Sequence, residues 1–464
     1  MKKILRRSVI VYALIGAFLV GMLTLIVSWA VDGRDWVMYS ANTHIYTGGK
    51  LISGGTITDR NGNILAKTVD DSRVYHSSQS VRSSLLHTVG DTELFIDRSI
   101  QNRYADTLLG YNFITGLHFS STWDKGNNIQ LTVDGDVCAA ALEALNGRKG
   151  AVCVYNWKTG DIICSVSAPT FDPQNKPDVD ASPEKYDGVY INRVLSGLYP
   201  PGSTFKIVTA AAALESIPDI QTRTFTCDGA YHAADGDVTC TDVHGEINFE
   251  TALNKSCNSV FAAIANELGA DRLNEQAKKM GFGSAQKVDD IEVNKSSFDA
   301  SGTGPADLGW AGIGQYTTLT TPFHMMNMMG AIANGGQGVK PHLIKNVTLP
   351  FGIPIQWASA SKNGRILEQS VADTLAEMMH SNVVNNYGQK SFPGLDICAK
   401  TGTAEVGGDK EPHSWIVGFV RDEDCPLAFA VVVENGGWGM KSAGPVANTV
   451  LQKAKDKLAV SGKK

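Results

Sequence analysis

The stretch YPPGSTFKIVTAAAALES, residues 199–216, says most about the fold of this chain. Its prolines and glycine predict a turn that ends at Ser203, and the Ala-rich pattern after the turn predicts a helix. A serine at a helix start directs its hydroxyl and the nearby backbone N–H groups at one point, where the helix dipole favours negative charge. Lys206 lies one helical turn further on, so its amine can take the proton of Ser203. The stretch predicts a nucleophile with its own base.

The bare pattern Ser-x-x-Lys is weak evidence, because four further copies begin at Ser182, Ser284, Ser359 and Ser461. Only the copy at Ser203 opens an apolar helix directly after a Pro-Gly turn. Free lysine has a pKa of about 10.4, so a lysine that acts as a base near neutral pH must be buried or lie beside a second cation. We therefore expect a partner cation near Lys206.

A second element is Ser256-Cys257-Asn258, which lies between two helical patterns. A hydroxyl and an amide two positions apart can both face a cleft from a short loop. The same pattern occurs at Ser40 and Ser361, and helix capping is the favoured interpretation of Ser256 and Asn258 when the triplet is taken alone.

A third element is Lys400-Thr401-Gly402-Thr403, within a strand-like run. Lysine and threonine groups on an edge strand can bind a substrate carboxylate, and Gly402 lets the ligand backbone approach closely. Lys400 would also supply the cation expected beside Lys206. The same tripeptide at residues 158–160 precedes the nucleophile and fits a hairpin turn.

The strand patterns lie at two distant places and enclose a helical middle, from about residue 190 to 390. Those patterns are GAVCVYN (150–156), DIICSVSAP (161–169), DICAKTGTAEV (396–406), HSWIVGFVRD (413–422) and LAFAVVVENGG (427–437). A last amphipathic helix follows at residues 448–459. We expect an α+β fold in which these strands form one antiparallel sheet with helices on both faces.

A chain of 464 residues is too long for one ordinary core. We predict a cytoplasmic stub with a transmembrane anchor at 1–34, a pedestal domain at 35–130 and the large domain at 131–464. The pedestal contains GGTITDRNGNILAK (54–67), in which Asn61-Gly62 predicts a hairpin turn.

Basic residues precede an uncharged apolar run of 24 residues, 8–31. At 1.5 Å per residue this run reaches roughly 36 Å, which is enough to cross a hydrocarbon layer of about 30 Å. The basic residues before it, and Asp32 and Asp35 after it, place the N-terminus in the cytoplasm and the rest outside. The alternative is a signal peptide cleaved near Ala30, but such apolar regions run about 7 to 15 residues. We expect a single-pass protein of the cell membrane.

A net charge of −6 without a basic patch argues against nucleic acid as a partner. The eight cysteines form no Cys-x-x-Cys pair, and no histidine stands at a recognised metal spacing, so we expect neither a metal nor a cofactor. Cys227 and Cys240 enclose a loop-like stretch, where a disulfide and two free thiols are equally plausible.

The order and spacing of the three elements resemble those of a known protein family. Ser256 follows Ser203 by 53 positions, and Lys400 follows Ser256 by 144. This set resembles the signature of penicillin-binding proteins and serine β-lactamases. Three further segments are similar to class B penicillin-binding proteins in particular, which are monofunctional enzymes: residues 57–66, 150–173 and 312–322.

The resemblance implies a peptidoglycan D,D-transpeptidase that needs no cofactor. Ser203 would form an acyl-enzyme with the D-Ala-D-Ala end of a stem peptide, Lys206 would act as base, and Ser256 would pass a proton to the leaving group. Asn258 would position the peptide and Lys206, Lys400 would contribute charge, and Thr401, Gly402 and Thr403 would bind the donor. Backbone N–H groups of Ser203 and Thr403 would form the oxyanion hole.

The implied partners are stem peptides, β-lactam antibiotics, the membrane through residues 8–31, and a membrane glycan polymerase. The alternatives are a D,D-carboxypeptidase and, less favoured, a β-lactamase or a β-lactam sensor.

Overall fold

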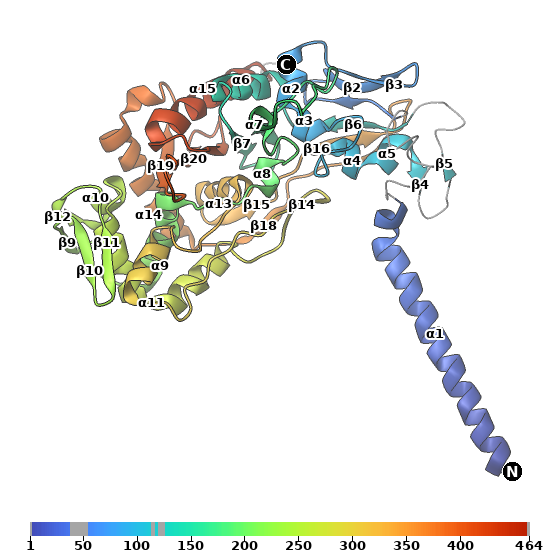
Figure 1. Cartoon of the computed structure of the whole chain (residues 1–464), viewed down its shortest axis with the longest axis horizontal. Coiled ribbons are helices and arrows are strands. Elements are labelled where there is room, and N and C mark those ends of the chain that lie inside the picture. Colours follow the sequence, from blue (N-terminus) through green and yellow to red (C-terminus); the bar gives the residue numbers. More distant parts are fainter. Residues whose placement is uncertain (1, 38–53, 113–116, 119–125, 462–464) are drawn as a thin grey trace.

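The structure is a computed structural model that describes residues 2–37, 54–112, 117–118 and 126–461. Its first element is the helix α1 (Lys2–Val37), which stands apart from the folded body in Figure 1. Within the described residues, α1 alone is long and apolar enough to cross a membrane, over Lys3–Gly33. The apolar run predicted as an anchor is therefore one continuous helix.

The centre of the body is a five-stranded antiparallel sheet with the order β19-β20-β21-β7-β8. Its strands are β7 (Gly150–Asn156), β8 (Ile162–Ala168), β19 (Ile397–Ala404), β20 (His413–Val420) and β21 (Leu427–Val433). Every residue of β8 and β21 is buried, because apolar and small residues occupy both faces. The prediction of one sheet from the two distant groups of strands is confirmed.

Helices cover this sheet on both faces, as predicted. α6 (Gly135–Leu145) and α15 (Gly439–Ser461) pack against each other over one face, and α13 (Pro322–Ala333) lies against β7, β20 and β21 on the other (Figure 1). The Asp134 side chain caps α6 by accepting the N–H groups of Asp136 and Val137. The five-stranded sheet is therefore enclosed between two layers of helices.

A second sheet of six strands joins segments from distant parts of the chain, in the order β17-β16-β6-β1-β2-β3. The strands are β1 (Ile57–Thr58), β2 (Ile64–Val69), β3 (Ser72–Tyr75), β6 (Asn128–Leu131), β16 (Ile344–Thr348) and β17 (Pro354–Trp357). The turn at Asn61-Gly62 joins β1 and β2, and the buried carboxylate of Asp59 accepts the N–H groups of Asn61 and Asn63. The pedestal sheet thus continues into β16 and β17, which lie far beyond residue 130 in the sequence.

The helical middle holds α9 (Lys206–Ser216), α10 (Phe249–Asn254), α11 (Asn258–Lys279), α12 (Pro305–Gly312) and α14 (Gln369–Asn382). Beside α10 and α11 lie two separate two-stranded sheets, which we call the hairpin lobe (Figure 1). It consists of β9 (Thr224–Cys227), β10 (Ala230–Ala233), β11 (Gly236–Thr239) and β12 (Gly245–Asn248). The stretch between Cys227 and Cys240 that looked like a loop is therefore a hairpin, because Ala230 to Ala233 pair with Gly236 to Thr239.

Shorter elements complete the described body. They are α2 (Gln79–Ser84), α3 (Leu86–Val89), α4 (Ile100–Arg103), α5 (Ala105–Leu109), α7 (Pro183–Tyr186), α8 (Arg193–Ser196), β4 (Tyr111–Asn112), β5 (Leu117–His118), β13 (Gln286–Val288), β14 (Ile291–Val293), β15 (Gln337–Val339), β18 (Lys362–Arg365), the 3₁₀ turns η2 (Gly202–Thr204) and η4 (Gln389–Ser391), and the π-helical turn η3 (Val383–Tyr387).

Candidate active site

Ser203 lies in the 3₁₀ turn η2, immediately before α9. Gly202 has a φ of 53°, and an added Cβ there would lie 2.6 Å from the carbonyl oxygen of Thr403. The turn is fixed by a hydrogen bond from Gly202 N to Gly314 O (2.9 Å) and by one from the Trp415 indole to Pro200 O (3.0 Å). Glycine is required at position 202 because the nucleophile turn presses directly on β19.

Lys206, the first residue of α9, is fully buried and joins the predicted groups. Its Nζ atom donates to Ser203 Oγ (3.1 Å), to Ser256 Oγ (3.2 Å) and O (2.6 Å), and to Asn258 Oδ1 (2.7 Å). Burial lowers the pKa of Lys206 to about 7. A neutral amine is thus accessible near physiological pH, 3.1 Å from Ser203 Oγ.

Ser256 and Asn258 lie where α10 ends and α11 begins. Ser256 has a φ of 54°, a left-handed conformation that costs a non-glycine residue of order 1–2 kcal/mol. The interpretation of the pair as helix caps is wrong, because the residue that caps α11 is Cys257, whose Sγ accepts the N–H of Val260 at 3.4 Å. Both side chains are directed to Lys206 instead.

Lys400 is also fully buried, on β19. Its Nζ atom donates to Ser256 Oγ (3.0 Å) and to Thr401 O (2.9 Å). Burial first, and repulsion by the Lys206 ammonium second, lower the pKa of Lys400 well below its ordinary value. Lys400 therefore lies on the far side of Ser256, as expected, but the pKa of Lys206 is lowered by burial and not by a second cation.

Thr401, Gly402 and Thr403 continue β19 along the site. β19 is the edge strand of the five-stranded sheet, so its outer side can pair with an extended peptide. A Cβ on Gly402 would lie 2.7 Å from the carbonyl oxygen of Pro201, which explains the glycine by contact with the nucleophile turn. Tyr387 was not predicted: its hydroxyl lies 2.8 Å from Thr401 Oγ1 and accepts the N–H of Thr401 at 2.8 Å.

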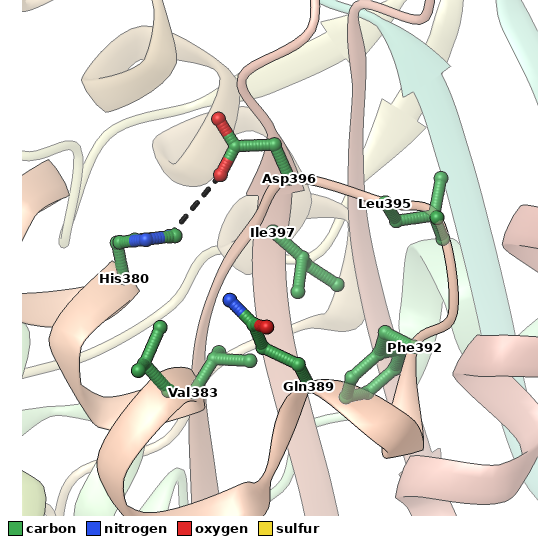
Figure 2. A pocket seen from close by; sticks show the side chains of 9 residues that line it. His380, Val383, Gln389, Phe392, Leu395, Asp396 and Ile397 are labelled. Carbon is green, nitrogen blue, oxygen red and sulfur yellow. Dashed lines mark ion pairs between the residues drawn. The ribbon is translucent and has the colours of Figure 1, made fainter.

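The hydroxyl and amide residues of this group line one cleft of about 750 Å³, whereas Lys206 and Lys400 are fully buried beside it. Its wall includes Ser203, Ser256, Asn258, Thr401 and Thr403, together with aromatic residues such as Trp310, Tyr387 and Trp438. A second cavity of about 430 Å³ lies between α14 and β19, where His380 and Asp396 form an ion pair at 3.2 Å (Figure 2). Its lining contains neither a hydroxyl nor a lysine, so the cleft at Ser203 is the candidate site for acyl transfer.

The structure also brings together Cys227, Cys240, His244 and Cys257, whose ligand atoms all lie within 4.8 Å of one another. All eight cysteines are free thiols, so the disulfide between Cys227 and Cys240 is not formed. The sequence argument against a metal missed this group. His244 follows Cys240 by four positions, and Cys257 follows His244 by 13, a spacing that a search restricted to short cysteine pairs does not detect.

Comparisons with known proteins agree with this geometry. The family model "Penicillin binding protein transpeptidase domain" matches residues 150–452. The peptidoglycan D,D-transpeptidase PbpA of Mycolicibacterium smegmatis is 28% identical over 432 residues, 86% of this chain and 85% of the relative. PbpA of Mycobacterium tuberculosis is 30% identical over 369 residues, 72% of this chain and 74% of the relative.

Solved structures agree as well. Penicillin-binding protein A from M. tuberculosis, as a ceftriaxone acyl-enzyme complex, superposes with a TM-score of 0.77 at 27% identity, covering 86% of this chain and 98% of that one. A D,D-transpeptidase domain from Eggerthella lenta gives a TM-score of 0.76 at 28% identity, with coverages of 88% and 100%. The chain belongs to the penicillin-binding protein transpeptidase family, as a class B member and a serine-type acyltransferase.

Proposed function

We propose that this protein is a peptidoglycan D,D-transpeptidase whose acyl-enzyme forms on Ser203. The observation that carries the proposal is the position of Lys206 Nζ, which contacts Ser203, Ser256 and Asn258, three residues that line one cleft. The same cleft has an edge strand on which an extended stem peptide can lie.

Acylation begins when neutral Lys206 accepts the Ser203 proton and Oγ attacks the carbonyl carbon of the penultimate D-alanine. The backbone N–H groups of Ser203 and Thr403 stabilise the oxyanion. The C–N bond then breaks, and the terminal D-alanine leaves as an amine. Its nitrogen receives a proton through Ser256 Oγ, which lies between Lys206 Nζ (3.2 Å) and Lys400 Nζ (3.0 Å).

The residues on β19 bind the donor. Thr401 and Thr403 hydrogen-bond the terminal carboxylate. Tyr387 fixes the Thr401 hydroxyl and backbone, so it acts as a positioning residue. The amine of a second stem peptide then attacks the acyl-enzyme carbonyl and releases Ser203, with proton transfer back through Lys206. A β-lactam mimics the donor and leaves the serine acylated.

The proposed topology places the N-terminus in the cytoplasm and the folded body outside. It rests on Lys2, Lys3, Arg6 and Arg7 before the apolar run of α1. The body would then act on strands supplied by a glycan polymerase of the same membrane. Protease added to intact protoplasts should digest the body. If the body is protected until the membrane is permeabilised, the orientation is wrong.

The central test is covalent labelling by a fluorescent penicillin, with mass spectrometry to locate the acyl group. Ser203→Ala should abolish labelling, while Ser182→Ala, at an exposed copy of the Ser-x-x-Lys pattern, should leave it unchanged. Labelling that persists in Ser203→Ala would refute the assignment.

A second test separates transpeptidase from carboxypeptidase. Nascent peptidoglycan incubated with the full chain should yield amide cross-links between stem peptides. Release of D-alanine with monomeric tetrapeptides alone would show that water resolves the acyl-enzyme and would establish a carboxypeptidase. Rapid turnover of the penicillin would indicate a β-lactamase.

A further inference from the structure

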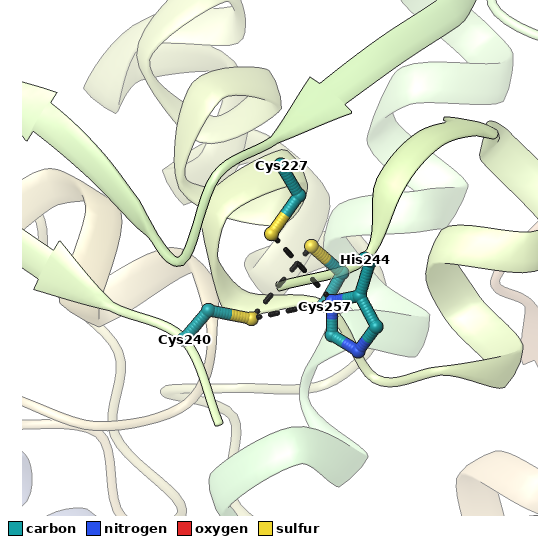
Figure 3. A group of neighbouring side chains, drawn as sticks. All are labelled: Cys227, Cys240, His244 and Cys257. Atoms are coloured by element: carbon teal, nitrogen blue, oxygen red, sulfur yellow. Dashed lines mark hydrogen bonds between the residues drawn. The ribbon is translucent and has the colours of Figure 1, made fainter. Parts of the chain in front are cut away.

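A cluster of four metal-binding side chains lies beside the cleft, and Figure 3 shows them converging on one point. Each comes from the end of a different element. Cys227 ends β9, Cys240 follows β11, His244 precedes β12, and Cys257 caps α11. No two of them are sequence neighbours, so only the fold brings them together.

The distances within the cluster fit a tetrahedral ion. Cys227 Sγ and Cys240 Sγ lie 3.5 and 3.6 Å from His244 Nδ1, and Cys240 Sγ lies 3.8 Å from Cys257 Sγ. Zinc binds sulfur at about 2.3 Å and nitrogen at about 2.0–2.1 Å, so the edges of its tetrahedron measure about 3.8 Å between sulfurs and about 3.6 Å between sulfur and nitrogen. A disulfide would instead need sulfurs about 2.05 Å apart.

We propose that Cys227, Cys240, His244 and Cys257 bind one zinc ion, and that this ion holds the Ser256–Asn258 segment of the active site in position. Three sulfurs and one imidazole nitrogen form a soft, closed donor set that suits tetrahedral Zn²⁺ and disfavours Mg²⁺ and Ca²⁺. Zinc has no redox chemistry and four protein ligands leave no open position, so its role is structural.

The surroundings of the sulfurs support metal binding. The N–H of Asn258 donates to Cys240 Sγ at 3.2 Å, and the N–H of Val260 donates to Cys257 Sγ at 3.4 Å. Such bonds orient the ligand sulfurs and stabilise their negative charge. Cys240 is partly exposed and belongs to the wall of the cleft, which gives the ion a route from solvent.

The same contacts couple the ion to catalysis. Cys257 stands between the two active-site residues Ser256 and Asn258. Asn258 is held twice by the segment that carries Cys240, through its backbone N–H to Cys240 Sγ and through Nδ2 to Thr239 O at 2.9 Å. An ion on Cys240 and Cys257 therefore fixes the loop whose side chains contact Lys206, and its ligands act as positioning residues.

The hairpin lobe also needs a cross-link. Its two sheets, β9 with β12 and β10 with β11, have two strands each, and most residues of β9, β11 and β12 are exposed or half-buried. Isolated two-stranded hairpins are marginally stable in water. A zinc ion supplies the stability that a small core cannot, because the folded lobe binds it and the unfolded lobe does not.

The test begins with the full chain purified in detergent without chelators. Elemental analysis should give about one zinc per chain, and replacement by Co²⁺ should produce the intense visible bands of a tetrahedral site together with thiolate-to-cobalt charge transfer. Cys227→Ser and His244→Ala should each weaken zinc binding at least 10-fold. Cys425→Ser, the same change at a buried cysteine outside the cluster, should not. A wild-type chain without zinc that gives no cobalt bands, or a disulfide within the cluster, would overturn the site.

A second readout tests positioning. Removing zinc with a chelator should slow acylation by a fluorescent penicillin at least 10-fold, and zinc but not magnesium should restore the rate. An unchanged rate in the zinc-free chain would end the positioning role. This inference rests on the proposed function only for that rate. Zinc content is independent of it, so Ser203→Ala should bind zinc normally even though it cannot be acylated.

Discussion

The two walls of the cleft at Ser203 are supported by different parts of the fold. One wall is β19, which pairs along its whole length with β20 in a sheet buried between helices. The other is the Ser256–Asn258 turn, which rests on α10, α11 and a lobe of two-stranded hairpins. β19 is thus built into the main core, whereas Ser256 and Asn258 depend on local contacts.

In the wall with the smaller core, polar hydrogen bonds must hold a strained backbone in place. Ser256 keeps a left-handed backbone, and its hydroxyl is fixed by both lysines. Such conformations persist only where the surroundings over-determine them. Lys206 joins the walls, because its amine contacts the turn directly and reaches β19 through Ser256 and Lys400. Changes at this junction should therefore cost more than changes within either wall.

The largest expected effect comes from Lys206→Met, which removes the base and the junction while keeping a buried side chain of similar length. Acylation by a fluorescent penicillin should fall by about 10²–10⁴-fold, the range for loss of general-base catalysis. Lys185→Met, at the exposed Ser-x-x-Lys copy, serves as the control. A loss below about tenfold, with the fold intact by circular dichroism, would show that another group accepts the proton.

The pH profile is the next largest effect. Lys206 must be neutral to accept a proton, and burial lowers its pKa to about 7. Acylation should therefore rise with pH, by about tenfold per unit below pH 7, and level off above it. Burial causes the Lys206 shift, and the Lys206 ammonium lowers the pKa of Lys400 and not the reverse, so Lys400→Met should leave this midpoint near pH 7. Stopped-flow acylation between pH 5 and 9 measures the profile, and a rate independent of pH would contradict the assignment of the base.

A smaller effect is expected from Gly402→Ala, which tests the sheet wall. The added Cβ would lie 2.7 Å from Pro201 O and 3.0 Å from Thr204 Cγ2, so β19 must move away from the nucleophile turn. A displacement near 1 Å should slow acylation by about ten- to a hundredfold. In Gly54→Ala the new Cβ meets ordinary contacts of 3.6 Å, so the rate should be unchanged. Equal acylation rates in Gly402→Ala and Gly54→Ala would show that β19 can move away from the nucleophile turn without slowing the reaction.

Much of this arrangement was predictable from the sequence. The sheet followed from apolar runs near residues 150 and 400, because period and β-propensity are local signals. The convergence of Ser203, Ser256 and Lys400 followed from the order of the motifs. The dominant cause of the lowered Lys206 pKa could not be predicted in this way, since burial depends on the packing of the whole domain.

Other features depend on pairings between distant segments, which local patterns do not encode. β16 extends the pedestal sheet by pairing with β6, more than 200 residues earlier in the chain. The cysteine cluster was hidden because the hairpin β10–β11 brings together ligands that lie 13 positions apart. Tyr387 was missed because it ends a π-helical turn, a rare distortion with no sequence signature that directs a hydroxyl to β19.

The smallest effect is expected from Tyr387→Phe, which leaves both walls in place and removes the hydrogen bonds of the Tyr387 hydroxyl, among them those to Thr401. A hydrogen bond of this kind contributes about 1 kcal/mol, so KM for a donor peptide should rise by about fivefold with kcat nearly unchanged. Tyr190→Phe, outside the cleft, is the control. A fall in kcat with constant KM would indicate that Tyr387 acts in the transition state instead of fixing the carboxylate-binding threonine.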